Sequence, residues 1–174
     1  MIMMRIFYRF ILTFNSLLLL LVVYLIKSHI WIWEQEQWSI AVYLLVPITL
    51  SIVCIKISDF LSLDSIEYVQ TIEVGEESYM AVYLGYFFVG TSISDGDWIT
   101  LICVFGMIFL FVFCSQAQYF NPIFLLLGYK FYGVTKENGV KIFVISKRRI
   151  QETEGLQFLD LRRINDFTFI DKGC

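Results

Sequence analysis

The residues best equipped for chemistry in this 174-residue chain are two basic runs near its end. One is Lys147, Arg148 and Arg149, and the other is Arg162 and Arg163. Such runs pair with phosphates and carboxylates, so they bind anionic lipid, nucleic acid or an acidic protein face. Direct nucleic acid binding is disfavoured, because residues 116–174 carry nine Lys and Arg against six Asp and Glu and show no recognition helix. We expect these five residues to bind a soluble protein partner, and the alternative is solvated strand ends near the inner leaflet.

Patterns for catalysis or metal binding do not occur in the sequence. Its one histidine is His29, and it has no H-E-x-x-H, P-loop, G-x-S-x-G or paired C-x-x-C motif. Three of the four cysteines lie within apolar stretches, which does not indicate a disulfide framework. We therefore expect no enzyme, no cofactor and no metal site.

The composition indicates a membrane protein. Hydrophobic residues make up 58% of the chain and charged residues only 17%, and the mean hydropathy is +0.71. A soluble domain of this size needs a more polar surface, so a free cytosolic enzyme is excluded as the default interpretation.

Charge-free windows predict four transmembrane helices, at about residues 10–26, 39–56, 78–94 and 98–116. The predicted fold class is an α-helical integral membrane protein. Its four transmembrane helices occupy residues 1–117, and a small β-rich cytoplasmic tail occupies residues 118–174.

The basic residues predict the orientation. Of the thirteen Lys and Arg, all except Lys27 fall on one side of these four spans, and such residues concentrate on the cytoplasmic side. Both termini are therefore expected in the cytoplasm, and the resemblance described below implies that the spans lie in the inner membrane of a bacterial cell. The opposite boundary carries four tryptophans that we expect to anchor in the lipid headgroups, namely Trp31, Trp33, Trp38 and Trp98.

Polar residues within the spans are few and uncharged. Pumps, voltage sensors and proton-coupled transporters need ionisable groups at depth, so these classes are disfavoured. Asn15 and Ser16 are predicted to form hydrogen bonds between helices. Ala81, Gly85 and Ser92 form a small-residue face on the third span, which predicts close packing against a helix of the same chain or of a second copy.

The tail shows strand patterns. Residues 124–135, 140–146, 157–161 and 167–170 predict strands, and the Asn-Gly pair at 138–139 predicts a hairpin. Residues 123–127 could instead lie in the membrane interface as an amphipathic continuation of the fourth span. Residues 65–74 alternate as a further half-buried strand. We expect Phe143, Phe167 and Phe169 to fill the core, and we expect this small unit to need a partner surface, which is the 65–74 strand, the membrane, another protomer or another protein.

Several segments give the chain a family resemblance. They are the Y-L-G-Y-F-F run at 83–88, Y-F-N-P at 119–122, G-Y-K-F-Y at 128–132 and R-I-N-D-F at 163–167. With the four spans and short outer loops, the chain resembles the KwaA-like proteins, the membrane subunit of the bacterial Kiwa anti-phage system.

The resemblance implies a homotetramer that senses phage attack at the membrane and recruits a cytosolic DNA-binding effector subunit (KwaB-like). Two other functions fit the sequence. One is immunity to a pore-forming bacteriocin, which requires only the spans, and the other is a subunit of an oligomeric pore.

Overall fold

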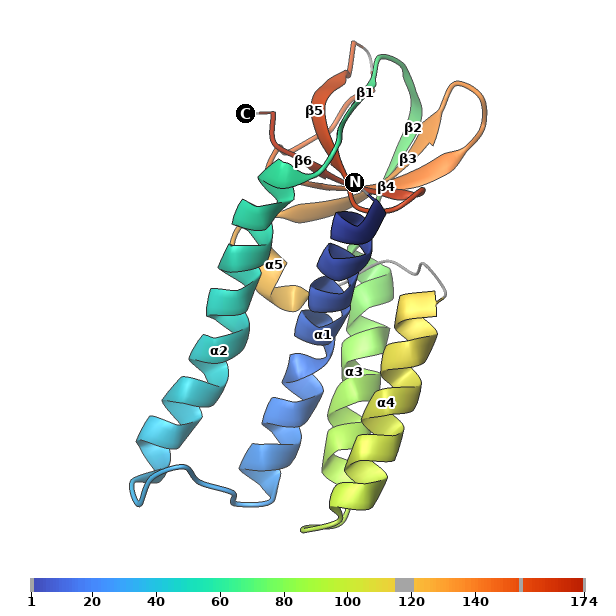
Figure 1. The fold of residues 1–174 in the computed structure, drawn as a ribbon. Helices are drawn as coiled ribbons and strands as arrows, with labels where there is room; N and C mark the ends of the chain where they lie inside the picture. Colours follow the sequence, from blue (N-terminus) through green and yellow to red (C-terminus); the bar gives the residue numbers. More distant parts are fainter. Residues whose placement is uncertain (1, 115–120, 154, 174) are drawn as a thin grey trace.

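A computed structural model describes residues 2–114, 121–153 and 155–173 (Figure 1). Four helices lie side by side, and a β-sheet covers one end of them (Figure 1). The helices are α1 (Ile2–Lys27), α2 (Glu36–Ile57), α3 (Glu76–Ser92) and α4 (Trp98–Cys114). Both ends of the chain lie at the end covered by the sheet, called here the sheet end (Figure 1). The opposite end, with the α1–α2 and α3–α4 connections, is called the far end.

Helix α1 is the centre of the bundle, because it packs against α2, α3 and α4. Leu12, Leu17 and Leu20 on α1 are fully buried, so its apolar face forms the middle of the helical core. Within the described residues, two helical stretches are long and apolar enough to cross a membrane, Met3–Lys27 and Glu36–Phe60. The apolar stretches in the other two helices, Ala81–Ser92 and Trp98–Cys114, are shorter.

The helices lie where the charge-free windows predicted them, with different ends. The largest difference is at the N-terminus, where α1 begins at Ile2 instead of residue 10. Arg5 and Arg9 do not interrupt this helix because both guanidinium groups find partners, Arg5 with Ser62 Oγ at 2.6 Å and Arg9 with Phe113 O at 2.8 Å. Residues 115 and 116 of the fourth expected span lie outside the described residues.

The sheet has six strands within the described residues, in the order β1-β5-β6-β4-β3-β2. The strands are β1 (Leu63–Ile66), β2 (Val69–Val74), β3 (Lys130–Lys136), β4 (Lys141–Ser146), β5 (Phe158–Arg163) and β6 (Thr168–Asp171). Neighbouring strands are antiparallel except β4 and β6. The two edges, β1 and β2, are consecutive in sequence and are joined by Glu67 and Tyr68. The sheet is therefore curled, with its two edges meeting at this connection.

The predicted 65–74 strand is confirmed as part of this sheet, divided into β1 and β2. These strands come from the connection between α2 and α3, so the expected division at residues 117 and 118 does not separate the sheet from the helices. Pairing with β3 and β5 gives the tail the partner surface that it was expected to need.

The strand prediction for residues 124–135 is wrong in its first part and correct in its second. Residues Pro122–Leu126 form a short helix, α5, and β3 begins only at Lys130. Asn121 caps this helix by accepting a hydrogen bond from the Ile123 amide at 3.0 Å, and Pro122 fits the first helical turn. The alternative for residues 123–127 is therefore confirmed as to the helix itself. Helix α5 does not continue α4, because its cap residue Asn121 is extended, with φ −126° and ψ 114°. The hairpin is confirmed too, with Gly139 at φ +78° in the turn between β3 and β4.

The central strands of the sheet are buried on both faces, whereas the edge strand β2 is mostly exposed. The inner face of the curl is lined by a core that includes Tyr132, Val134, Val144 and Phe169. The prediction that Phe169 lies in the core is confirmed, whereas Phe143 is only half-buried. The same prediction is wrong for Phe167, which is 47% exposed because it lies in the turn before β6.

Candidate functional site

The sheet is joined to the helices by a common apolar core. Phe131, Ile145 and Ile170 on the outer face of the curl pack with Tyr8 of α1 and Cys54 of α2, and all five are buried. Helix α5 contributes Phe124, which is fully buried in the same core. We call this contact between the sheet and the helix ends the junction. Because the core is continuous, a movement of α1 or α2 changes the surface on which the sheet rests.

Three basic side chains converge at the junction on the segment that leaves α2. Arg5 reaches Ser62, and Arg162 Nη1 donates to Asp59 O at 3.2 Å. Lys172 Nζ donates to Ile55 O at 2.6 Å and pairs with the Asp59 carboxylate at 2.9 Å. These residues come from α1, from β5 and from the position directly after β6. They stabilise the position of the sheet relative to α2.

A buried polar network lies among α1, α2 and α5. The hydroxyl of Ser51 accepts hydrogen bonds from the side-chain amides of Asn15 at 2.8 Å and Asn121 at 3.1 Å. It donates to Pro47 O at 2.7 Å. The three residues that share this hydroxyl are at most 1% exposed. The expectation that Asn15 forms a bond between helices is confirmed, whereas Ser16 donates within α1, to Thr13 O.

The residues predicted to bind a partner have different surroundings. Arg148 is engaged within the sheet, where its Nε donates to Asp171 Oδ2 at 2.7 Å and its guanidinium lies 4.8 Å from the centre of the Phe158 ring. The side chain of Asp171 is fully buried. Arg162 contacts the end of α2, and Arg163 pairs with Asp166 at 2.9 Å.

Lys147 and Arg149 are exposed. Lys147 Nζ lies 4.9 Å from the centre of the Tyr129 ring, beside the junction. Of the five predicted residues, these two leave their cationic groups most available to a partner. The structure does not bring all five into one cluster, since Arg148, Arg162 and Arg163 each have a different set of partners.

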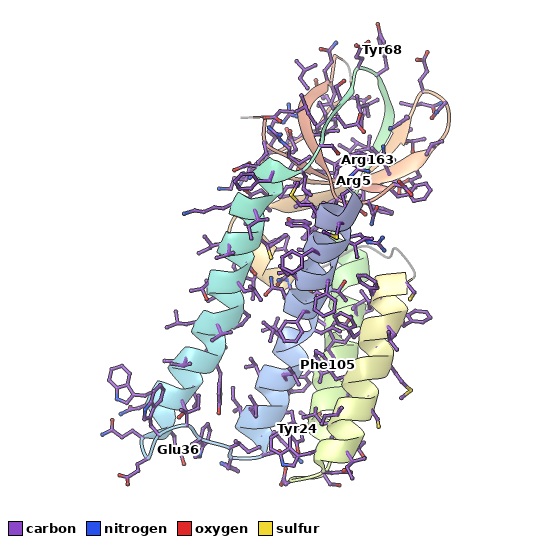
Figure 2. All side chains as sticks on the ribbon, in the orientation of Figure 1. Arg5, Tyr24, Glu36, Tyr68, Phe105 and Arg163 are labelled. Carbon is purple, nitrogen blue, oxygen red and sulfur yellow. The ribbon has the colours of Figure 1, made fainter. Side chains whose placement is uncertain are left out.

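The far end carries the tryptophans. Trp33 and Trp38 lie in and after the α1–α2 connection and are 51% and 61% exposed, and Trp98 at the start of α4 is 47% exposed. Trp31 is half-buried, with its ring 5.8 Å from that of His29. Tyr24 and Glu36, labelled in Figure 2, mark this end of the molecule, opposite Arg5 and Arg163. The indoles therefore form one level across the far end.

Lys27, the lone Lys or Arg of the far end, is paired. Its Nζ lies 2.7 Å from Asp95 Oδ1 and donates to Ile93 O at 2.9 Å. Hydrogen bonds from Lys27 and then Ser28 lower the pKa of Asp95. Bonds from the hydroxyl and amide of Thr100 lower the pKa of Asp97 in the same connection.

The small-residue face of α3 points away from the rest of the chain. Ala81, Gly85 and Ser92 are exposed, and a Cβ added to Gly85 would meet no atom within 4 Å. The close approach between α1 and α3 occurs instead at Gly90, where a Cβ would lie 3.1 Å from Leu20 O. Of the two partners left open for this face, a helix of the same chain does not contact Gly85 among the described residues. The role of Gly90 was not predicted from the sequence.

A comparison with known protein families identifies the chain. The family model described as anti-phage protein KwaA matches residues 8–170, which covers nearly the whole chain. The chain belongs to the KwaA family. Neither a curated protein nor a solved structure matches it.

Membership of the KwaA family confirms the predicted resemblance and implies a role in anti-phage defence. The match includes all four long helices from Tyr8 onward and ends within β6. The junction therefore lies inside the region that the family model describes.

Some charged residues of the junction and of the sheet were overlooked in the sequence. They are Arg5, Asp59 and Lys172 at the junction and Asp171, which pairs with Arg148 within the sheet. Each is a charged residue next to a predicted span or strand end, where a solvated side chain is the usual expectation. Their partners lie far away in the sequence, up to 117 residues for Lys172 and Ile55, so no local pattern indicates them. Within the described residues, no group of three His, Cys, Asp or Glu side chains is placed to hold a metal ion.

Proposed function

We propose that the chain is a four-span inner-membrane subunit of an anti-phage defence complex that presents its sheet to a soluble effector in the cytoplasm. The observation that carries this proposal is the distribution of apolar and basic residues along the molecule. An apolar bundle is joined, through a continuous core, to a sheet that holds most of the basic residues. Such a molecule connects events in a membrane to a surface in the cytoplasm.

The exposed surface of the bundle supports four membrane crossings. Ile102 and Phe111 on α4 are 68% and 75% exposed, and Phe87 and Phe88 on α3 are 50% and 61% exposed. A water-soluble bundle rarely exposes apolar side chains on this scale. Helices α3 and α4 have 17 residues each, or about 25 Å, which is near the lower limit for one crossing.

The charge distribution supports a cytoplasmic sheet. Lys27 alone lies at the far end, where it is paired with Asp95, and the other twelve of the thirteen Lys and Arg lie at the sheet end. Basic residues near membrane spans favour the cytoplasm. The exposed indoles of Trp33, Trp38 and Trp98 fit the opposite headgroup region.

Self-association belongs to the same proposal. The exposed face with Ala81, Gly85 and Ser92 permits a helix of a second copy to approach closely. We propose a homo-oligomer, and the tetramer implied by the family resemblance is its expected size.

The proposed effector is the soluble KwaB-like subunit, and no enzymatic activity is assigned to this chain. The structure favours exposed Lys147 and Arg149 as its basic contacts, because Arg148 is engaged with a buried carboxylate. Bacteriocin immunity and pore formation are less favoured, since neither explains a sheet held to the helices by a shared core.

Membrane vesicles of opposite orientation test the proposal. Inside-out vesicles that contain the chain are expected to bind the purified effector, because they expose the sheet, whereas right-side-out vesicles are not. Vesicles without the chain are the control for lipid binding. Equal binding to all three preparations, or to none, would contradict the proposed function.

A matched pair of variants then tests the basic contacts. Lys147→Glu with Arg149→Glu is expected to lower effector binding by at least tenfold while the chain stays in the membrane. The control is Lys56→Glu with Lys130→Glu, which changes the same charge elsewhere at the sheet end. If both pairs reduce binding equally, the effect is one of net charge and these two residues are not specific contacts.

A further inference from the structure

The edge strand β2 leaves main-chain groups without a strand partner. Gly75 N donates to Phe131 O at 3.0 Å, so Gly75 and Phe131 form a hydrogen-bonded pair of the antiparallel ladder. Such pairs alternate along a ladder with pairs whose amides and carbonyls point away. Ile72 and Val74 lie opposite Val134 and Tyr132 in this register. Their main-chain amides and carbonyls therefore point toward the free edge. The pairing of β3 with β4 agrees, because Lys136 N donates to Val140 O on that side.

Protection against edge pairing is weak along β2. Natural edge strands are usually blunted by proline, lysine or a charge that points inward. The six residues of β2, V-Q-T-I-E-V, contain neither proline nor lysine. The one charge, Glu73, lies on the exposed side and pairs with Lys141. The register with β3 shifts once, between Val69 and Thr71, and is regular from Thr71 to Val74. This regular part of the β2 edge can accept another strand.

A groove runs beside this edge. One wall is Gln70, Thr71 and Ile72 of β2, and the other is Gln151–Thr153 of the β4–β5 connection. Its volume is about 610 Å³. The lining is mostly polar, which suits a peptide main chain better than a lipid tail.

A second groove lies at the tip of the sheet, the part farthest from the helices, which Tyr68 marks in Figure 2. It includes Glu67, Tyr68 and Glu137 and has a volume of about 480 Å³. Together the two grooves present three carboxylates, of Glu67, Glu137 and Glu152. None of these three takes part in an ion pair among the residues that the structure describes. Lys136 also lines the second groove, with its Nζ 5.6 Å from the centre of the Phe169 ring. Three carboxylates against one ammonium leave the two grooves net negative, which favours a basic occupant.

A second copy of the chain does not suit this edge. Strand β2 runs from the tip toward α3 (Figure 1). Copies in one bilayer are related by rotation about the membrane normal, so their β2 strands would run in the same direction and meet through the same edge. Parallel strands bond through opposite edges, so the two β2 edges cannot pair. A soluble protein has no such restriction.

We propose that the free edge of β2 is the docking site for an extended, basic segment of the soluble partner, which adds a strand by pairing its main chain with Ile72 and Val74. This inference rests on the proposed function, because the partner is the effector named there. It adds where that partner binds and which conformation its segment takes.

Hydrogen exchange of the unaltered full-length chain in detergent tests the site, with the purified effector as the probe. The peptide that spans β2 is expected to exchange at least tenfold more slowly when the effector is bound, because the outward amides of Ile72 and Val74 become donors. Binding that leaves β2 exchange unchanged overturns the inference and leaves the proposed function intact. Slow exchange in β2 that depends on the chain's own concentration, without effector, also overturns it, since the occupant is then a second copy.

Variants give an independent measurement. Ile72→Pro removes an outward amide and is expected to weaken effector binding at least tenfold, whereas Ile72→Val keeps the amide and binds normally. Val74→Pro also removes an outward amide and is expected to weaken effector binding at least tenfold. The side chain of Val74 is 59% exposed, so this variant remains informative if Ile72→Pro is unstable. Glu152→Gln is expected to weaken binding severalfold at low salt and to reduce its salt dependence. Normal binding by both proline variants contradicts the inference. An effector that does not bind the unaltered chain at all refutes the proposed function, and the inference with it.

Discussion

Replacement of Arg148 by alanine tests whether this arginine stabilises the sheet or binds a partner. The size of the expected effect follows from its contacts. The side chain donates to the fully buried carboxylate of Asp171 and lies over the ring of Phe158. A hydrogen bond to a charged group contributes about 1.5–3 kcal/mol, and a partly exposed cation–π contact about 0.5–1 kcal/mol. Asp171 keeps bonds from Ser146 Oγ and Gly173 N. We therefore expect Arg148→Ala to lower the free energy of unfolding of the sheet by about 3 kcal/mol.

The matched control is Arg149→Ala, which removes the same side chain from the adjacent, exposed position. Its effect on stability is expected to be within about 0.5 kcal/mol. Arg148→Lys should lie between the two, because it keeps the charge but loses the planar group that bonds Asp171 and Gln157 O.

A urea titration of the full-length chain in detergent gives the measurement. Hydrogen exchange in peptides from β4 and β6 reports the sheet, since the tryptophans lie at the far end and do not. With a urea dependence of about 1–3 kcal/mol per M, the midpoint for Arg148→Ala should fall by about 1–3 M. Equal midpoints for the two alanine variants would refute the structural role of Arg148. Arg148 would then be a candidate contact for the partner again.

The remaining predictions concern the helices. Gly90→Ala should destabilise the α1–α3 contact by about 1–3 kcal/mol, measured by thermal unfolding in detergent, because its Cβ meets backbone. Gly85→Leu should leave that contact unchanged but weaken self-association in crosslinking, and an unchanged oligomer would remove this face from the interface. Ser51→Ala should lower stability by about 2–4 kcal/mol, since two buried amides lose their acceptor, and an effect below about 0.5 kcal/mol would contradict the network. Lys27→Gln should raise the pKa of Asp95 toward its ordinary value in an NMR titration. In the unaltered chain the pKa of Asp95 is lower than that of a free aspartate. The contact with Lys27 therefore stabilises the fold at a pH above the pKa of a free aspartate, and this stabilisation is lost as the pH falls through the lowered pKa of Asp95.

Local sequence patterns predicted the elements well. Charge-free windows located the four long helices, because apolar runs of this length have few alternatives to a helix in a membrane. The Asn138-Gly139 pair located the β3–β4 hairpin, because its turn needs a residue with positive φ. The ends were less accurate, since Arg5 and Arg9 continue α1 instead of ending it.

Contacts between distant segments could not be predicted in the same way. Alternation identified residues 65–74 as a strand but could not show that its two halves form opposite edges of one sheet. Arg148 and Arg149 are identical in type and adjacent, yet one meets Asp171 and the other faces solvent. Gly85 and Gly90 are equally small, and only the tertiary structure shows that Gly90 contacts α1. The candidate site depends on these pairings.

Cysteine accessibility in intact spheroplasts tests the proposed topology, because the proposed function requires four membrane crossings with the sheet in the cytoplasm. The four native cysteines are replaced, and single cysteines are introduced as Gln35→Cys and Ser94→Cys at the far end and as Tyr68→Cys and Glu137→Cys on the sheet, all at exposed positions. A membrane-impermeant maleimide added from outside is expected to label the two far-end cysteines at once. It should label the two sheet cysteines only after the membrane is permeabilised. Labelling of Tyr68→Cys or Glu137→Cys in intact spheroplasts, or protection of Ser94→Cys, would contradict the four-span arrangement and the cytoplasmic docking surface together.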